Sequence, residues 1–183
     1  MPVRDITYMP LSAETFGKCS LDGFVRRQQV TECWRQEQGA LVLRPAVFTE
    51  DWNLEERRER AMRILRALET GGAAFRALAE QQVVGYVLLE GTAGSAHQLL
   101  KLNSFHVSEP YRRRGIGRNL FDLACGEARC RGCRGLYISA CSARETQAAY
   151  RAYGCIPAHA EEIDPESAAE EPCDIQMIYL LDV

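Results

Sequence analysis

The sequence has no excess of positive charge and no long apolar run, and each absence excludes a class of protein. It contains 22 Lys and Arg residues against 25 Asp and Glu residues, for a net charge of −3, whereas nucleic-acid-binding domains are usually basic overall. Its longest apolar stretches, such as residues 83–91, are too short to span a bilayer. The first residues lack the apolar segment of a secretion signal. We therefore expect a cytoplasmic protein with neither nucleic acid nor a membrane as its partner.

Paired metal ligands are scarce, although cysteine itself is not. Of the eight cysteines, Cys130 and Cys133 have CxxC spacing, and Cys125 lies about one helical turn upstream. A structural zinc site needs four ligands, and the sequence offers no second CxxC or HxxxH pair. Because no export signal is present, we expect reduced thiols rather than disulfides. We interpret these cysteines as small apolar residues of the core and predict no metal.

The hydrophobic pattern and the turn residues predict a single α/β domain over residues 1–183. The expected strands cover residues 5–12, 30–48 (a hairpin turning at Gln38-Gly39), 73–80, 83–91, 97–108, 135–141 and 173–183. A tight turn at Gln81-Gln82 joins the third and fourth of these segments. The acidic residues 160–172 are expected to form a loop between two strands.

Four helices are expected between these strands. The first is short and lies near residues 13–24, and the second runs from Leu54 to Thr70. The apolar positions of the second helix predict that its buried face carries Leu54, Ala61, Leu65 and Leu68. The third helix begins near Gly115 and ends near Gly132, and the fourth covers residues 143–154.

Arginines gather around two glycines where the third helix begins. They are Arg112, Arg113, Arg114 and Arg118, around Gly115 and Gly117. A helix N-terminus presents unpaired N–H groups and a partial positive charge, and glycine lets a ligand approach the backbone closely. The stretch lacks the Lys-Ser/Thr of a Walker A loop and the third glycine of a dinucleotide-binding fingerprint. It therefore predicts a site for a phosphate or pyrophosphate group of another kind.

The segment "FHVSEPYRRRGIGRNLF" resembles the acetyl-CoA loop of the GCN5-related N-acetyltransferases. Downstream, "ETQAAYRAYGC" is similar to the next helix of that family, with Tyr150 four positions before Gly154. The resemblance extends over residues 85–155. It implies a mixed, mostly antiparallel sheet that is splayed between two central strands and flanked by helices. It also implies acetyl-CoA as the acetyl donor.

The resemblance further implies which residues bind the donor. These are Phe105, Val107, Arg112, Arg113, Arg114, Gly115, Ile116, Gly117, Arg118, Ser142 and Thr146. Many members carry an Asn seven residues before the tyrosine, where this chain has Ala143. Ser142, Ser139 or a water molecule would then make the contact to the pantetheine arm.

For catalysis, the resemblance implies that Tyr150 is the general acid that protonates the departing thiolate, with packing against the sheet as the alternative role. His106 is the candidate general base, since a histidine titrates near neutral pH. A surface histidine or a relayed water is the alternative. Around the second helix start, Trp34, Glu50, Asp51 and Trp52 predict an acidic, aromatic-walled pocket for a cationic amine.

These features predict an N-acetyltransferase acting on a primary amine of a small molecule or a protein. A non-catalytic acyl-CoA-binding module is the alternative, and phosphate contacts to nucleic acid are a third interpretation that the acidic total disfavours. The acceptor stays open among a polyamine, an aminoglycoside or streptothricin-type antibiotic, an amino acid and a protein N-terminus. The chain is expected to act as a monomer or a homodimer.

Overall fold

The computed structural model describes residues 5–93 and 98–181. They form two compact units. The first contains residues 5–27, 51–91 and 102–127, and the second contains residues 28–50, 92–93, 98–101 and 128–181. Within the described ranges, no helix has both the length and the apolar character needed to cross a membrane.

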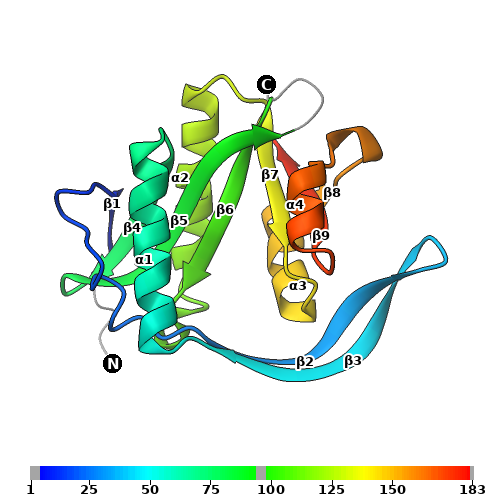
Figure 1. The fold of residues 1–183 in the computed structure, drawn as a ribbon, viewed down its shortest axis with the longest axis horizontal. Coiled ribbons are helices and arrows are strands. Elements are labelled where there is room, and N and C mark those ends of the chain that lie inside the picture. Colours follow the sequence, from blue (N-terminus) through cyan, green and yellow to red (C-terminus); the bar gives the residue numbers. More distant parts are fainter. Residues whose placement is uncertain (1–4, 94–97, 182–183) are drawn as a thin grey trace. The chain divides into compact units, whose positions relative to one another are not determined.

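The first unit is built on four strands. In spatial order they are β1 (Thr7–Pro10), β4 (Ala73–Ala79), β5 (Gln82–Ala93) and β6 (Leu99–Val107). Pairing is antiparallel from β1 to β4 and from β4 to β5. Helix α1 (Leu54–Glu69) covers one face of these strands, and α2 (Ile116–Cys130) lies on the other (Figure 1).

Alternation along β5 determines which side chains meet each helix. Tyr86 and Leu88 are fully buried in the cluster that also contains the inner residues of α1. Gly85 faces the other way, where an added Cβ would lie 2.9 Å from Leu120 and 3.1 Å from Ile116 of α2. Only glycine leaves room for α2 to approach the sheet this closely.

Helix α1 starts at a capping box, in which Asn53 and Glu56 exchange side-chain and backbone hydrogen bonds. Its buried residues are Ala61, Ile64 and Ala67. The prediction that Leu54 belongs to this face is wrong, because Leu54 is the first helical residue and is 43% exposed. A side chain in the first turn of α1 lies outside the part of the helix surface that the strands cover.

The second unit contains β7 (Gly135–Ala140), β9 (Ile175–Leu180) and β8 (Ile156–Pro157) in that order. β7 runs antiparallel to β9, and the first residues of β6, Leu99–Lys101, run parallel to Gly135–Tyr137. Helix α3 (Arg144–Tyr153) follows β7. A long hairpin of β2 (Arg27–Glu37) and β3 (Ala40–Asp51) completes the unit (Figure 1). The predicted fold class, a mostly antiparallel mixed sheet with flanking helices, is confirmed.

The residues at the tight turns explain where the predicted turn positions agree with the structure and where they differ. The β2–β3 turn is at Gln38-Gly39 as predicted, with φ values of 49° and 84°, the left-handed pair that tight hairpins need. The β4–β5 turn lies at Glu80-Gln81 (φ 49° and 68°), one residue before the predicted position.

The predicted helix near residues 13–24 is wrong. This segment is a series of turns, with backbone hydrogen bonds such as Ser20 N–H to Gly17 O at 2.9 Å. The acidic residues 160–172 do join two strands, as predicted. They contain the 3₁₀ helix η2 (Ala160–Glu162) and the short helix α4 (Pro165–Glu170) rather than an irregular loop throughout. Another 3₁₀ helix, η1 (Glu109–Tyr111), precedes α2.

All eight cysteines are free thiols. Cys33, Cys125 and Cys155 are buried as small core residues, whereas Cys19, Cys130 and Cys173 are exposed. The interpretation as core residues therefore holds for some of the cysteines only, since a turn or a helix end places the others at the surface.

Candidate functional site

The backbone turns at the start of α2 through two residues with unusual φ angles. Arg113 and Gly115 both have left-handed φ values, 58° and 79°. Such a turn directs successive N–H groups toward one point, which is how backbone cradles bind anions. No atom lies within 4 Å of the place where a Gly115 side chain would project. The turn therefore has left-handed backbone at two residues and open space beside Gly115.

Arg112 anchors this turn to the neighbouring backbone. Its Nε donates to the carbonyl oxygen of Val107 at 3.0 Å, and its NH1 donates to the carbonyl oxygen of Arg27 at 2.7 Å. A guanidinium used in this way ties the turn to the end of β6 and to the start of β2. Arg112 thus supports the turn through bonds to the protein's own backbone.

The other three predicted arginines are exposed. The Arg114 guanidinium lies over the Tyr111 ring, 5.4 Å from its centroid. Arg118 pairs with Asp122 one helical turn later, at 3.1 Å, and such an exposed pair is weak. Arg113, Arg114 and Arg118 therefore lie at the surface around the turn.

The end of β6 sends neighbouring side chains to opposite faces of the first unit. Phe105 packs against Phe121 of α2, with ring centroids 6.3 Å apart. His106 points to the α1 side, where its ring is 4.7 Å from the Trp52 ring and 5.5 Å from the Tyr86 ring. The structure thereby gives the orientation of His106, which alternation in the sequence left open.

His106 is poorly suited to accept a proton in this arrangement. Arg26 Nε donates to His106 Nδ1 at 3.2 Å, so the neutral ring carries its proton on Nε2. Burial, together with the charges of Arg26, Arg60 and Arg112, lowers the pKa of His106 well below its usual value of 6.5. Both observations disfavour His106 as the general base.

Both tryptophans predicted to line an amine pocket have arginine side chains of the protein against their rings. In the first unit, guanidinium carbons of Arg26 and Arg60 lie 5.9 Å and 5.1 Å from the Trp52 ring. In the second unit, Arg151 lies 5.4 Å from the Trp34 ring. These contacts are the cation–π interactions expected for a cationic ligand, and here the protein itself makes them.

Tyr150 lies in α3 of the second unit and is 8% exposed. Gly154 ends the helix with a left-handed φ of 98°, as predicted from the sequence. Burial is the main reason why the pKa of Tyr150 is raised, and the nearby Asp174 carboxylate adds to the effect. The phenol therefore keeps its proton at neutral pH, which a general acid must do.

The hydroxyl groups proposed for the pantetheine contact are already engaged within the second unit. Ser142 is 4% exposed, and Arg35 NH1 donates to its Oγ at 2.7 Å. Ser139 Oγ lies 3.0 Å from Gln176 Nε2. Thr146 is half-buried in the first turn of α3. Their contact to a donor remains a prediction.

The two acidic residues at the end of β3 differ in surroundings. Asp51 is exposed, whereas Glu50 is partly buried and its charge helps to raise the pKa of Cys141 and of Asp174. Asp174, directly before β9, is a half-buried carboxylate that sequence analysis missed. A single acid before a strand carries no sequence signal, because its burial depends on distant segments.

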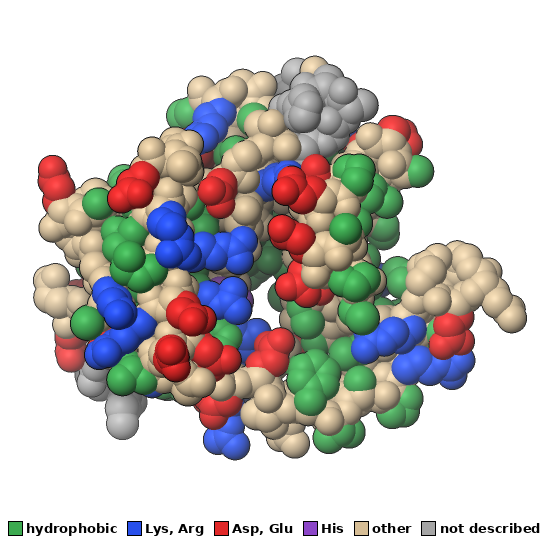
Figure 2. Space-filling view, in the orientation of Figure 1, with side chains coloured by type: hydrophobic (Ala, Val, Ile, Leu, Met, Phe, Trp, Pro, Cys, Tyr) green, Lys and Arg blue, Asp and Glu red, His purple; other side chains and the backbone are tan. Residues whose placement is uncertain are grey.

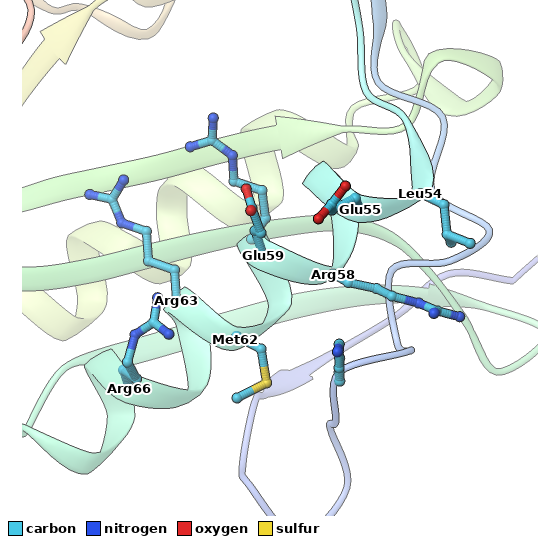
Figure 3. A pocket seen from close by; sticks show the side chains of 9 residues that line it. Leu54, Glu55, Arg58, Glu59, Met62, Arg63 and Arg66 are labelled. Carbon is cyan, nitrogen blue, oxygen red and sulfur yellow. The ribbon is translucent and has the colours of Figure 1, made fainter.

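A hollow of about 970 Å³ runs along α1. Lys and Arg side chains gather over this helix (Figure 2). Its lining residues are Lys18, Leu54, Glu55, Arg58, Glu59, Arg60, Met62, Arg63 and Arg66. Figure 3 shows Arg58 pointing away from Arg63 and Arg66, and Arg58 pairs with Asp22 at 2.7 Å. None of the lining residues was predicted to bind a ligand.

No cluster of three or more His, Cys, Asp or Glu side chains in the described ranges could hold a metal ion.

Solved structures similar to this chain share its fold. Nourseothricin acetyltransferase is 16% identical, with a TM-score of 0.72 over 97% of this chain and 99% of the other. A putative streptothricin acetyltransferase from Bacillus anthracis, solved with acetyl coenzyme A, is 15% identical with a TM-score of 0.68, over 97% and 99% of the two chains. A GNAT-family acetyltransferase from Staphylococcus aureus is 15% identical with a TM-score of 0.63, over 97% and 100%.

The sequence itself was compared with families and with curated proteins. No curated protein matches. The model of the Acetyltransferase (GNAT) family matches residues 33–154. The matched range includes the turn before α2 and the helix that carries Tyr150. This chain belongs to the acetyltransferase (GNAT) family.

Proposed function

We propose that this chain transfers an acetyl group from acetyl-CoA to a primary amine of a small molecule or a protein. Family membership supports acetyl transfer in general, and a similar structure contains acetyl coenzyme A. The amine acceptor and the roles of individual residues are parts of the proposal.

The open turn at Arg113–Gly115 is the observation on which the proposal depends most. Its left-handed backbone and the free space at Gly115 fit a pyrophosphate group. The following helix adds its dipole, and three exposed arginines add positive charge. A simple basic turn at the surface would need neither the left-handed residues nor the free space.

Bound acetyl-CoA supplies a thioester whose acyl carbon an amine can attack. The turn before α2 holds the diphosphate, with Arg112 fixing the turn to the end of β6. Phe105 and Val107 are assigned backbone contacts to the pantetheine arm. Tyr150, which is protonated at neutral pH, is assigned the proton transfer to the departing thiolate.

Thiol release tests the proposal directly. The protein would be incubated with acetyl-CoA and a panel containing a polyamine, an aminoglycoside, a streptothricin, an amino acid and a peptide with a free N-terminus. Free CoA would be followed by a thiol reagent, and acetylated amine would be identified by mass spectrometry. We expect amine-dependent CoA release for at least one acceptor, with one acetyl group on a nitrogen.

The alternative is a non-catalytic acyl-CoA-binding module, and the same experiment separates the two. Such a module binds acetyl-CoA in calorimetry without amine-dependent thiol release. That result would overturn the assignment of catalysis and leave the binding turn in place.

A further inference from the structure

A directed chain of hydrogen bonds crosses the second unit and ends on Asp174. The backbone N–H of Asp164 donates to Tyr137 Oη at 3.0 Å, and Tyr137 Oη donates to Gln176 Oε1 at 2.6 Å. Gln176 Nε2 donates to Ser139 Oγ at 3.0 Å, and Ser139 Oγ lies 3.2 Å from Asp174 Oδ2. Since a backbone N–H can only donate, each later hydroxyl or amide must pass its own hydrogen onward. Ser139 therefore donates to the Asp174 carboxylate.

This chain fixes one carboxylate oxygen and leaves the other available. Asp174 Oδ2 receives the Ser139 hydrogen bond, while Oδ1 has no hydrogen bond or ion pair within the described ranges. Tyr137 is 1% exposed and Gln176 lies opposite Ser139 in the β7–β9 ladder. The orientation of the carboxylate is thus set by two strands rather than by a mobile surface loop.

We propose that Asp174 is the general base of the acetyl transfer, accepting a proton from the acceptor's ammonium group through Oδ1. Ser139 and Gln176 are positioning residues that orient it. This inference rests on the proposed function and names the group that prepares the amine for attack.

The groups around Asp174 favour this role. Glu50 of β3 and Glu171 lie near enough to raise its pKa, Tyr150 of α3 and Cys141 also lie nearby, and no Lys or Arg in the described ranges pairs with it. Burial is the largest cause and raises the pKa of Asp174 to about 6, although the Ser139 hydrogen bond opposes the shift. Such a carboxylate is mostly ionised at pH 7 and is a stronger proton acceptor than an ordinary one.

Two protons leave the acceptor nitrogen during the proposed transfer. The ammonium group gives one proton to Asp174 Oδ1, and the neutral nitrogen forms a C–N bond to the thioester carbonyl carbon. The tetrahedral intermediate collapses with cleavage of the C–S bond, and Tyr150 protonates the departing thiolate. The nitrogen's second proton restores Tyr150, and Asp174 returns its proton to solvent. The acetyl group moves from sulfur to nitrogen, and nothing is oxidised or reduced.

The test compares Asp174→Asn with the wild type, using the amine with the highest rate in the thiol-release panel. We expect kcat/KM at pH 7 to fall by roughly 100- to 10,000-fold, as for loss of a general base, with acetyl-CoA affinity unchanged in calorimetry. Glu170→Gln is the matched control, because it removes an exposed carboxylate of α4 that is not among the groups that shift the pKa of Asp174. It should keep kcat/KM within about twofold of the wild type.

A second variant tests the positioning role of Ser139. It also tests the role of Asp174 if Asp174→Asn does not fold. Ser139→Ala removes the donor that stabilises the ionised carboxylate. The acidic limb of the kcat/KM profile, expected near pH 6 in the wild type, should then move to higher pH. A structural role for Ser139 would lower the rate without moving that limb.

The outcomes separate this inference from the proposed function. Amine-dependent acetylation by the wild type, with Asp174→Asn equally active or with no movement of the acidic limb in Ser139→Ala, would overturn the role of Asp174 alone. Absence of acetylation by the wild type across the panel would overturn both.

Discussion

Tyr150 and Asp174 are titratable residues of the second unit whose surroundings shift their pKa values in the same direction for different uses. Burial keeps the Tyr150 phenol protonated, so that it can donate, and it brings the Asp174 carboxyl closer to neutral pH, so that it can accept. A tyrosine and a carboxylate near each other can therefore divide acid and base work between them. His106, in the first unit, has its acceptor nitrogen occupied by Arg26.

The role of Tyr150 is tested by removing only its hydroxyl group. Tyr150→Phe keeps the ring and its packing, so acetyl-CoA binding and the unfolding midpoint should change little. We expect kcat to fall by roughly ten- to ten-thousand-fold, because the departing thiolate loses its proton donor. Steady-state kinetics across pH and calorimetry with acetyl-CoA measure the two effects. A wild-type kcat at every pH would show that Tyr150 serves packing alone.

The turn before α2 shows how a structural element can combine support and binding. Arg112 hydrogen-bonds to backbone carbonyl groups of the protein itself, whereas Arg113, Arg114 and Arg118 are exposed. The proposed diphosphate site thus depends on one short segment both for its support and for its positive charge.

Substitution of Gly117 tests this element. Gly117→Asp adds a carboxylate in the first turn of α2, where the diphosphate is proposed to bind. Two like charges about 4 Å apart near a protein surface repel by about 4 kcal/mol, so acetyl-CoA affinity should fall by more than about a hundredfold. Gly126→Asp, on the same helix with open space at its Cβ, is the control and should bind normally. Equal affinity in the two variants would place the donor elsewhere.

The end of α3 makes a separate prediction about stability. Gly154 has a φ of 98°, and a Cβ there would lie 3.3 Å from the Tyr179 ring. Gly154→Ala should therefore lower the free energy of unfolding by about 1–2 kcal/mol, the usual cost of a left-handed non-glycine residue. Gly126→Ala should instead raise it by up to about 1 kcal/mol, since that glycine is helical. Urea titration of both variants gives the comparison, and an unchanged midpoint for Gly154→Ala would refute the strain argument.

For the whole molecule, the partly buried His106 links stability to pH. The pKa of His106 is lowered in the folded protein, so between that pKa and the ordinary value near 6.5 the unfolded chain binds more protons than the folded one. By linkage, the free energy of unfolding rises with pH across this range. The folded protein therefore becomes less stable as the pH falls below about 6.5. Asp174 acts in the opposite sense, because its pKa is raised to about 6 and ionisation there disfavours the folded state.

A variant separates the histidine from the other titrating groups. His106→Gln cannot gain a proton, so its free energy of unfolding should decrease less than that of the wild type between pH 7.5 and pH 5.5, measured as urea midpoints at both values. Equal decreases in the two proteins would mean that His106 titrates normally in the folded state.

Much of the fold and the turn could be predicted because local patterns specify them. The 3.6-residue period of α2 and α3, the glycine stop at Gly154 and the left-handed pair Gln38-Gly39 all act within a few residues of chain. The helix expected near residues 13–24 failed because its turn-forming residues hydrogen-bond locally instead. Leu54 was misassigned because a periodic pattern does not show where a neighbouring strand stops covering a helix.

The sequence alone therefore determined the family resemblance, most of the helices and strands, and the arginine–glycine turn, since each depends on residues close together in the chain. Only the tertiary structure decided which titratable groups face one another. Ser139 and Asp174 are 35 residues apart and Tyr137 and Gln176 are 39 apart, and Arg26 meets His106 across 80 residues. Burial and charge at these positions come from segments that fold together from distant parts of the chain, and these surroundings set the pKa of each group.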